Sequence, residues 1–154
     1  MSTEAVIAII NLDDTVRYVD LVNDGDLAGG ILLGHYNNFT AANALTSGGV
    51  ISALRPALQD CIFHALNWGR DKRETITNVE TLFGMADVIA GGDDNEFPVY
   101  VFDAREYHRD YNVYGEFHYH KMYGTPLMVG SPFTNKQYWK RLAGDGTLHP
   151  IQAI

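Results

Sequence analysis

The segment from Val16 to Leu54 limits the possible folds of this chain more than any other segment. It opens with β-branched residues, passes through Asn23-Asp24-Gly25-Asp26, and continues with apolar residues at helical spacing. Asp-Gly favours a tight turn, because aspartate can bond its own backbone and glycine has no Cβ to clash. The order predicts a strand, this turn, a helix over Leu27–Tyr36, a second helix over Thr40–Ala44 with Thr40 as its N-cap, and a short strand at Ile51. Ser47-Gly48-Gly49 is the predicted stop of the second helix, since glycine reaches a positive φ without a Cβ clash.

The neighbouring segments add a hairpin before this region and two apolar stretches after it. Ala5–Leu12 is nearly all apolar, which predicts a strand covered on both faces. We expect this strand to form a hairpin with a second strand over Thr15–Val22. Ala57–Trp68 is compatible with a helix or with an irregular apolar segment. Val79–Ala90 repeats apolar residues at three- and four-residue steps, which predicts an amphipathic helix that begins after Thr77 or Asn78.

Two strands and an irregular tail are predicted at the C-terminal end. Phe97–Phe102 and Tyr111–Tyr119 have high β-propensity and predict antiparallel strands joined by Asp103–Asp110. Glycine and proline then recur from Gly124 onward, leaving only Asn135–Leu142 as a candidate short helix. We expect an α+β fold with an N-terminal hairpin, two or three short helices, C-terminal antiparallel strands and an irregular C-terminal arm. Residues 1–121 would form a single domain, and residues 122–154 an arm packed on it or on a neighbouring subunit in a homo-oligomer.

Composition narrows the class of function. The chain has 11 Lys and Arg and 19 Asp and Glu, a net charge of −8 with neutral His, which disfavours nucleic acid and anionic membranes and suits a basic partner. Cys61 is the only cysteine, so no intramolecular disulfide can form, and its apolar neighbours favour a buried thiol over a nucleophile. Neither a signal core nor an apolar run of membrane-spanning length is present, so we expect a soluble cytoplasmic protein.

Several short blocks resemble a widespread group of small phage and prophage proteins. That group has the pattern T-V-x-x-I-Y-x-H-x-D-G-Y-P, then G-x-x-L-L-x-x-Y, then L-x-x-x-G-x-I-S-x-L. The matching residues are Thr15-Val16-Arg17-Tyr18, Asp24-Gly25-Asp26, Gly29, Leu32-Leu33, Tyr36, Leu45, Gly49, Ile51-Ser52 and Leu54. With a later helix and strand, the likeness covers residues 15–102.

The chain departs from that pattern at its most polar corner. Val22-Asn23-Asp24-Gly25-Asp26-Leu27 lacks the His, Tyr and Pro of the group. The group has no assigned activity, so the resemblance implies a phage accessory protein in the host cytoplasm and gives no mechanism.

The richest polar sites are Tyr107-His108-Arg109-Asp110 and Phe117-His118-Tyr119-His120. Tyr and Trp are favoured where one end of a side chain is wet, so these sites suit a recognition surface for a ligand or partner. Burial of the aromatic residues in the core is an equal alternative. The candidate binding residues are Tyr107, His108, Arg109, Tyr114, His118, His120 and Trp139.

Two other polar patterns have alternative interpretations. His118 and His120 would share one face of a strand and, with His108, could ligate a metal; an exposed His- and Tyr-rich sheet face is favoured instead. Gly25–Gly30 could present backbone N–H groups to a phosphate, although tight packing of the hairpin on the helix is favoured.

Three functions follow from these patterns. The preferred hypothesis is a non-enzymatic phage accessory protein without cofactor, which binds a host protein or sequesters a small ligand in host takeover or anti-defence. A metal-assisted hydrolase or lyase that uses His108, His118 and His120 is the first alternative. A virion structural protein, whose arm embraces a neighbouring copy, is the second.

Overall fold

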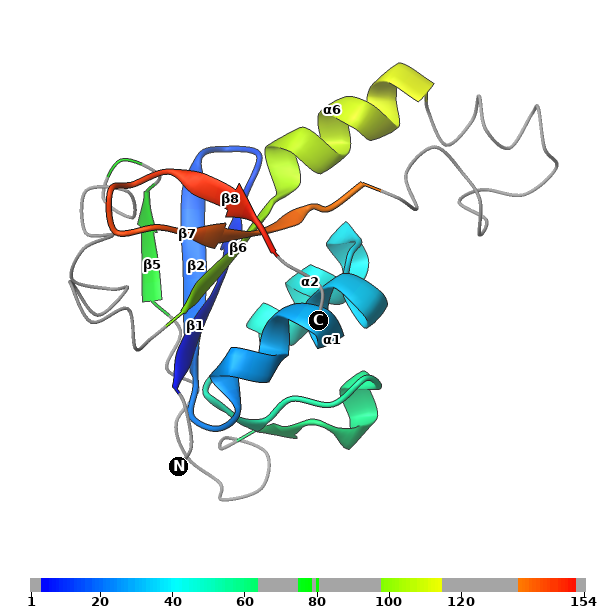
Figure 1. Cartoon of the computed structure of the whole chain (residues 1–154). Helices are drawn as coiled ribbons and strands as arrows, with labels where there is room; N and C mark the ends of the chain where they lie inside the picture. The colour runs from blue at the N-terminus through cyan, green and yellow to red at the C-terminus, as the bar shows by residue number, and fades with distance from the viewer. Residues whose placement is uncertain (1–3, 64–74, 79, 81–97, 115–135, 152–154) are drawn as a thin grey trace, which may run out of the picture.

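Strands β1 (Ala5–Ile10) and β2 (Thr15–Leu21) lie side by side within a mixed β-sheet (Figure 1). The computed structural model describes residues 4–63, 75–78, 80, 98–114 and 136–151, which are the described residues below. β1 and β2 pair antiparallel with Ile7 opposite Val19, and the backbone N–H of Asn11 donates to the carbonyl of Thr15 at 2.8 Å across the turn.

The other strands extend the sheet on both sides of this pair. They are β3 (Ile51–Ala53), β4 (Ile62–Phe63), β5 (Thr75–Asn78), β6 (Val99–Asp103), β7 (Trp139–Leu142) and β8 (Leu148–Pro150). The order is β4-β3-β2-β1-β6-β7-β8, and β5 pairs with the first half of β2. β6 runs parallel to β1, whereas β7 and β8 continue antiparallel from β6.

Helices α1 (Ala28–His35) and α2 (Phe39–Thr46) lie together on one face of the sheet (Figure 1). A 3₁₀ turn, η1 (Gly25–Leu27), leads from β2 into α1, and a second, η2 (Leu58–Asp60), lies between β3 and β4. Helix α6 (Ala104–Tyr114) begins directly after β6. Helices and a mixed sheet together confirm the α+β class. Within the described ranges, no helix is long and apolar enough to cross a membrane.

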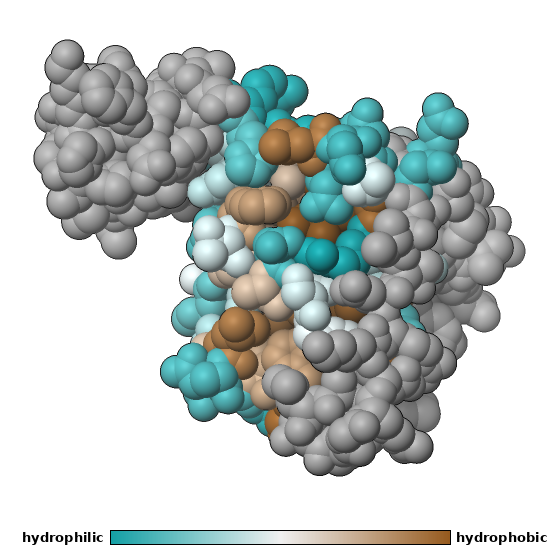
Figure 2. Space-filling view, turned by 180° about the vertical axis from the view of Figure 1, so that it is seen from behind, coloured by the Kyte–Doolittle hydropathy of each residue, from teal (hydrophilic) through white to brown (hydrophobic). Residues whose placement is uncertain are grey.

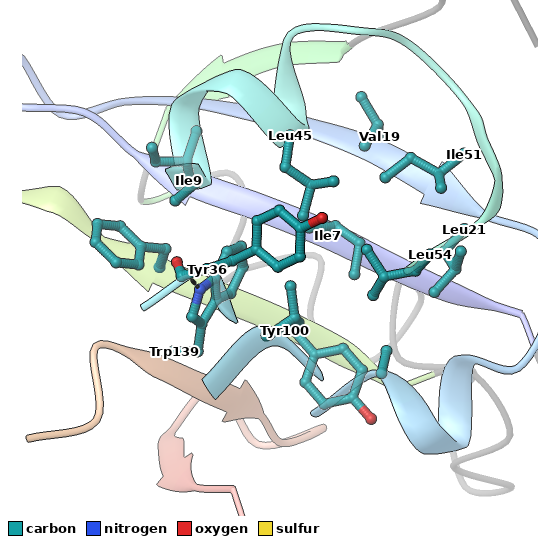
Figure 3. Packing of buried hydrophobic residues seen from close by; sticks show 14 of the residues in the cluster. Ile7, Ile9, Val19, Leu21, Tyr36, Leu45, Ile51, Leu54, Tyr100 and Trp139 are labelled. Atoms are coloured by element: carbon teal, nitrogen blue, oxygen red, sulfur yellow. Dashed lines mark hydrogen bonds between the residues drawn. The ribbon is translucent and has the colours of Figure 1, made fainter. Parts of the chain in front are cut away.

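The core follows the alternation of side chains along the strands. Ile7 and Ile9 of β1 face the helices in the larger cluster, and Ala8 and Ile10 belong to a second buried cluster on the other face. β1 is therefore covered on both faces, as its apolar sequence predicts. The large, wholly buried side chains of the first cluster include Trp139, Leu45, Leu21, Ile7 and Ile51 (Figure 3).

The ends of α2 show one prediction confirmed and one wrong. Gly49 takes a φ of 86°, the backbone region predicted for the glycines that follow this helix. The N-cap is Asn38, whose side-chain oxygen accepts the backbone N–H of Ala41 at 2.9 Å, and not Thr40, which lies inside the helix. Asparagine and threonine are both good caps, and the chain uses the earlier one.

At the C-terminal end, β6 confirms the predicted strand Phe97–Phe102 over residues 99–102, whereas the predictions for the segments after it are wrong where the structure describes them. The sequence pattern predicts a connection over Asp103–Asp110 and a strand over Tyr111–Tyr119, yet α6 runs through both as far as Tyr114. Residues 139–142 form a strand and not a helix, and residues 148–150 also form a strand in place of irregular structure. Pairing with β6 and burial of Trp139 outweigh the weak helical preference of this segment.

The two apolar stretches in the middle of the chain are described only in part. Ala57–Phe63 holds η2 and β4 and no long helix, so the helical alternative is wrong there. Thr77 and Asn78 lie in β5, paired with β2. The predicted helix over Val79–Ala90 falls outside the described residues apart from Glu80.

Ion pairs tie the start of α6 to the sheet. Arg105 donates to both carboxylate oxygens of Asp103, at 3.0 and 2.9 Å, and to Asp14 at 3.0 Å. Burial would raise the pKa of the Asp103 carboxyl, but the hydrogen bonds and charge of Arg105 outweigh burial and hold this pKa below its usual range. Farther along the helix, Lys140 pairs with Glu106 at 2.9 Å.

Replacing Arg105 with glutamine should lower the free energy of unfolding by about 1 kcal/mol at neutral pH, because the pair is only partly shielded from water. The folded pKa of Asp103 is depressed, so its stabilisation is present above the unfolded value of about 3.9 and is lost as pH falls through the folded value. Urea titrations of both proteins at several pH values should therefore show the difference shrinking in acid. Arg55→Gln, at an exposed site, is the control, and a difference that persists unchanged in acid would contradict this account.

Candidate functional site

A cavity of about 720 Å³ lies between the start of α1 and strands β7 and β8. Gly29 and Gly30 line it from the helix, Tyr100 from β6, and Arg141 and His149 from the two outer strands. The cavity combines an apolar floor with a few polar groups.

The strand register places three polar side chains of the cavity in one row. Tyr100 pairs with Arg141 across β6 and β7, and Arg141 pairs with His149 across β7 and β8. Directly opposed residues point to the same face of a sheet, and Tyr100 belongs to the cluster that faces the helices. Ile7 of β1 stands at the other side of Tyr100, so the row changes from apolar at the sheet centre to polar at its edge.

The floor of the cavity depends on a glycine of α1. A Cβ on Gly29 would lie 2.6 Å from Cγ2 of Ile151 and 3.4 Å from Cε1 of Tyr100, so only a residue without a side chain allows this packing. A Cβ on Gly30 would meet no atom within 4 Å, which shows that this position faces open space. Gly29 therefore has a packing role, but its nearest neighbours are β6 and the residue after β8, and not the hairpin that the sequence predicts for this segment.

Tyr100 supplies an uncharged part of the floor. Its side chain is 5% exposed, and its hydroxyl donates to the carbonyl of Gly25 at 2.8 Å. Burial raises the pKa of Tyr100, which the charge of Arg141 and a hydrogen bond from the Gly29 backbone partly offset; Asp26 adds to the rise. The phenol is therefore protonated at neutral pH.

The rim carries charged and apolar side chains in contact with solvent. Arg141, His149 and Asp26 are exposed, and Leu27 is 57% exposed. His149 Nε2 lies 2.6 Å from the hydroxyl of Thr147. Among the described residues, no side-chain hydrogen bond or ion pair engages the guanidinium of Arg141 or the carboxylate of Asp26. The cavity thus offers an available guanidinium beside an apolar floor.

A second, more open cavity of about 400 Å³ lies beside the β1–β2 turn, lined by Asn11, Leu12, Asp13, Thr15 and Phe39. Its carboxylate is engaged within the turn, because Asp13 accepts the hydroxyl and the backbone N–H of Thr15 at 2.6 and 3.0 Å. On the face shown in Figure 2, hydrophobic and hydrophilic residues of the described part are interspersed, so this view gives no surface to prefer over the larger cavity.

Two residues nominated for a recognition surface lie in the core, which corrects that assignment. Trp139 has no exposed area, and its indole N–H donates to the carbonyl of Tyr36 at 2.8 Å (Figure 3). Tyr107 is 7% exposed and stands edge-on to Tyr138 with ring centroids 5.0 Å apart. Both rings bury large apolar areas, which is the commoner use of aromatic residues.

The other nominated residues are not gathered into one site by the described structure. His108 lies on α6 with its ring centroid 4.7 Å from that of Phe39, and its buried Nε2 has no hydrogen-bond partner there. Arg109 is exposed on the same helix, and the side chain of Tyr114 lies outside the described part, as do His118 and His120 entirely. The described residues contain no group of three His, Cys, Asp or Glu side chains that could hold a metal ion, and the convergence of the three histidines stays a prediction.

Cys61 is buried, as predicted. Its sulfur lies 3.3 Å from the hydroxyl of Tyr36 and accepts the backbone N–H of Arg55 at 3.3 Å. Burial and the hydrogen bond with Cys61 raise the pKa of Tyr36. The thiol thus belongs to a buried polar contact that holds the segment after β3.

Comparison with known proteins identifies no relative. No protein-family model matches the chain, and no curated protein or solved structure matches it either. The function is therefore inferred from the cavity and from the sequence resemblance alone. Sequence patterns do not reveal the cavity residues Arg141 and His149, because they predict a short helix around Arg141 and irregular structure around His149.

Proposed function

We propose that the chain is a phage accessory protein that acts by binding, and that the cavity beside α1 holds a small ligand. The cavity carries this proposal. Its volume of about 720 Å³ is typical of small-molecule sites, and an apolar floor with a few polar groups is the usual composition of such sites. The phage origin depends on the sequence resemblance over residues 15–102.

In this proposal the protein sequesters its ligand in the host cytoplasm. Removing a small molecule from solution needs only affinity and abundance, so neither a cofactor nor a reaction is required. Such removal would serve host takeover or counter a host defence. The metal-assisted enzyme and the virion component depend on His118, His120 and the segment after Lys121, of which the described residues include only 136–151.

Filling the cavity from Gly30 should abolish ligand binding. Gly30 and Gly34 are both exposed on α1, a Cβ on either would meet no atom within 4 Å, and only Gly30 lines the cavity. Phenylalanine at either position should leave the helix intact, because its helix propensity exceeds that of glycine. We expect Gly30→Phe to weaken binding at least about tenfold, as bulk replaces the ligand's apolar contacts, and Gly34→Phe to bind like the unchanged protein.

The measurement is a protein-observed NMR titration with four naphthalene compounds of matched size: 1-naphthyl phosphate, 1-naphthoate, 1-naphthamide and 1-naphthylmethylammonium. Shifted signals should come from the cavity residues, including Gly29, Tyr100 and Ile151. The proposal fails if none of the four compounds shifts these signals, or if Gly30→Phe binds as well as Gly34→Phe.

A further inference from the structure

We infer that the ligand of this cavity is a small organic anion, with a carboxylate or phosphate group held by Arg141 and an apolar or planar body on the floor. This inference rests on the proposed function and specifies its ligand class. The availability of the guanidinium, its position in the strand register and the shape of the floor support it.

Arg141 is both available and well placed. Its guanidinium is exposed at the rim, and none of the ion pairs among the described residues engages it. It extends from β7, which is paired on both sides by β6 and β8, so its backbone is held by the sheet. A guanidinium presents a planar fork of N–H donors that matches carboxylate and phosphate oxygens.

Among the described residues that line the cavity, Arg141 is the one permanent cation and Asp26 the one carboxylate, so the lining is formally neutral although the whole chain carries −8 with neutral His. The guanidinium extends from the strand position directly opposite Tyr100, so it lies on the Tyr100 side of the cavity. Burial is the main influence on the pKa of Tyr100 and raises it; of the two charges, Arg141 lowers this pKa by more than Asp26 raises it. Distant acidic residues matter less, since salt screens charges beyond about 8–10 Å. His149, directly opposite Arg141, adds a second nitrogen-bearing side chain to this side of the cavity.

The anion is assigned to Arg141 and not to the start of α1. Gly29 is buried, and the side chains of Ile151 and Tyr100 pack against it, so this part of the helix start is covered within the protein. Helix α1 contributes one wall of the cavity. Gly29 packs on Ile151, and Gly30, which has no side chain, leaves the space beside the helix open. Leu27 at the rim and Ile151 at the floor provide the apolar surface for the rest of the ligand.

The same four naphthalene compounds test the ligand class. We expect the phosphate and the carboxylate to bind about tenfold or more tighter than the neutral amide, and the ammonium compound to bind weakest. Arg141→Gln should weaken binding of the anions roughly 10- to 100-fold and leave the amide unchanged. Arg141→Lys should retain part of the affinity, because it keeps the charge and loses the fork. Arg55→Gln, with the same loss of charge at an exposed site away from the cavity lining, should bind like the unchanged protein.

The outcomes separate the ligand class from the proposed function. If the amide or the ammonium compound binds as tightly as the anions, or if Arg141→Gln binds anions unchanged, the anion inference is overturned while binding in the cavity stands. If no compound binds, the proposed function itself fails. The comparison of phosphate with carboxylate then tells which anionic group the site prefers. Circular dichroism of each variant confirms folding, which substitution of an exposed side chain should leave intact.

Discussion

Replacing Trp139 with alanine should lower the free energy of unfolding by about 3–5 kcal/mol, a loss typical of a large aromatic side chain removed from a core. Trp139 has no exposed area, and its ring stands edge-on to Phe102 with centroids 5.4 Å apart. The indole N–H also donates to the Tyr36 carbonyl at the end of α1, so this one side chain joins β7, β6 and the helix layer. Domains of this size are stable by only about 5–15 kcal/mol, and the variant should be close to unfolding at ambient temperature.

Urea titrations followed by far-UV circular dichroism measure this loss. Trp139→Phe keeps an aromatic ring and removes the N–H, so about 1–3 kcal/mol should be lost, mainly through the unpaired Tyr36 carbonyl. Leu12→Ala deletes apolar atoms from a side chain that is 63% exposed and should change stability by less than about 0.5 kcal/mol. If Trp139→Ala were no more destabilising than Leu12→Ala, Trp139 would not be a core residue.

The parts of the fold that follow local rules could be predicted from sequence. The helix over α1, the glycine stop after α2 and the doubly buried strand β1 each depend on a pattern of neighbouring residues. The N-cap of α2 shows the limit of such rules, since Asn38 and Thr40 are both suitable and only the structure distinguishes them.

The start of α6 differs from the prediction although its sequence contains a helix signal. Asp103 is followed three residues later by Glu106, the spacing of an N-terminal capping pattern. In the structure the Asp103 carboxylate accepts the backbone N–H of Arg105 at 3.0 Å, and so caps the helix. The aromatic residues from Tyr111 onward favour a strand, but helix propagation from a capped start outweighs β-propensity as far as Tyr114.

The β7–β8 hairpin also differs from the prediction, although its sequence contains a turn signal. The glycines of Gly144-Asp145-Gly146 resemble a break in an irregular tail, whereas they form a turn between two strands. Asp145 accepts the backbone N–H of Thr147 at 3.0 Å, and Gly146 has a φ of 86°. An Asp-Gly pair between two segments that mix apolar and polar residues is a hairpin signal that the sequence does contain.

Even a correct prediction of the β7–β8 hairpin would not have revealed the candidate site. Arg141 and His149 share a face with Tyr100 only because β7 pairs with β6 in one particular register. A shift of one residue would turn Lys140 toward α1 and Arg141 away from it. Register is fixed by burial of Trp139 and Leu142 on opposite faces, which is a property of the assembled sheet and not of either strand alone.

Replacing Gly25 with valine should cost about 3 kcal/mol, the next largest effect expected on stability. A Cβ at this position would lie 2.7 Å from Cβ of Ala5 and 2.8 Å from the carbonyl carbon and oxygen of Glu4. Backbone atoms cannot rotate away as a flexible side chain could, so η1 would have to move off β1. The glycine is needed for this close approach and not for a positive φ, because Asp24 takes the left-handed conformation of the turn, with a φ of 57°.

Gly30→Val is the matched control, since the same side chain at that position would meet no atom within 4 Å. Valine has a higher helix propensity than glycine, so this variant should be as stable as the unchanged protein or slightly more stable. Urea titrations of the two variants would contradict the packing of η1 on β1 if their midpoints were equal.

Because η1 leads into the helix that walls the cavity, Gly25→Val should also weaken binding of 1-naphthyl phosphate, although Gly25 itself is not among the lining residues. A destabilised Gly25→Val that still bound this probe normally would mean that the cavity wall is held from β7 and β8 and not from the turn.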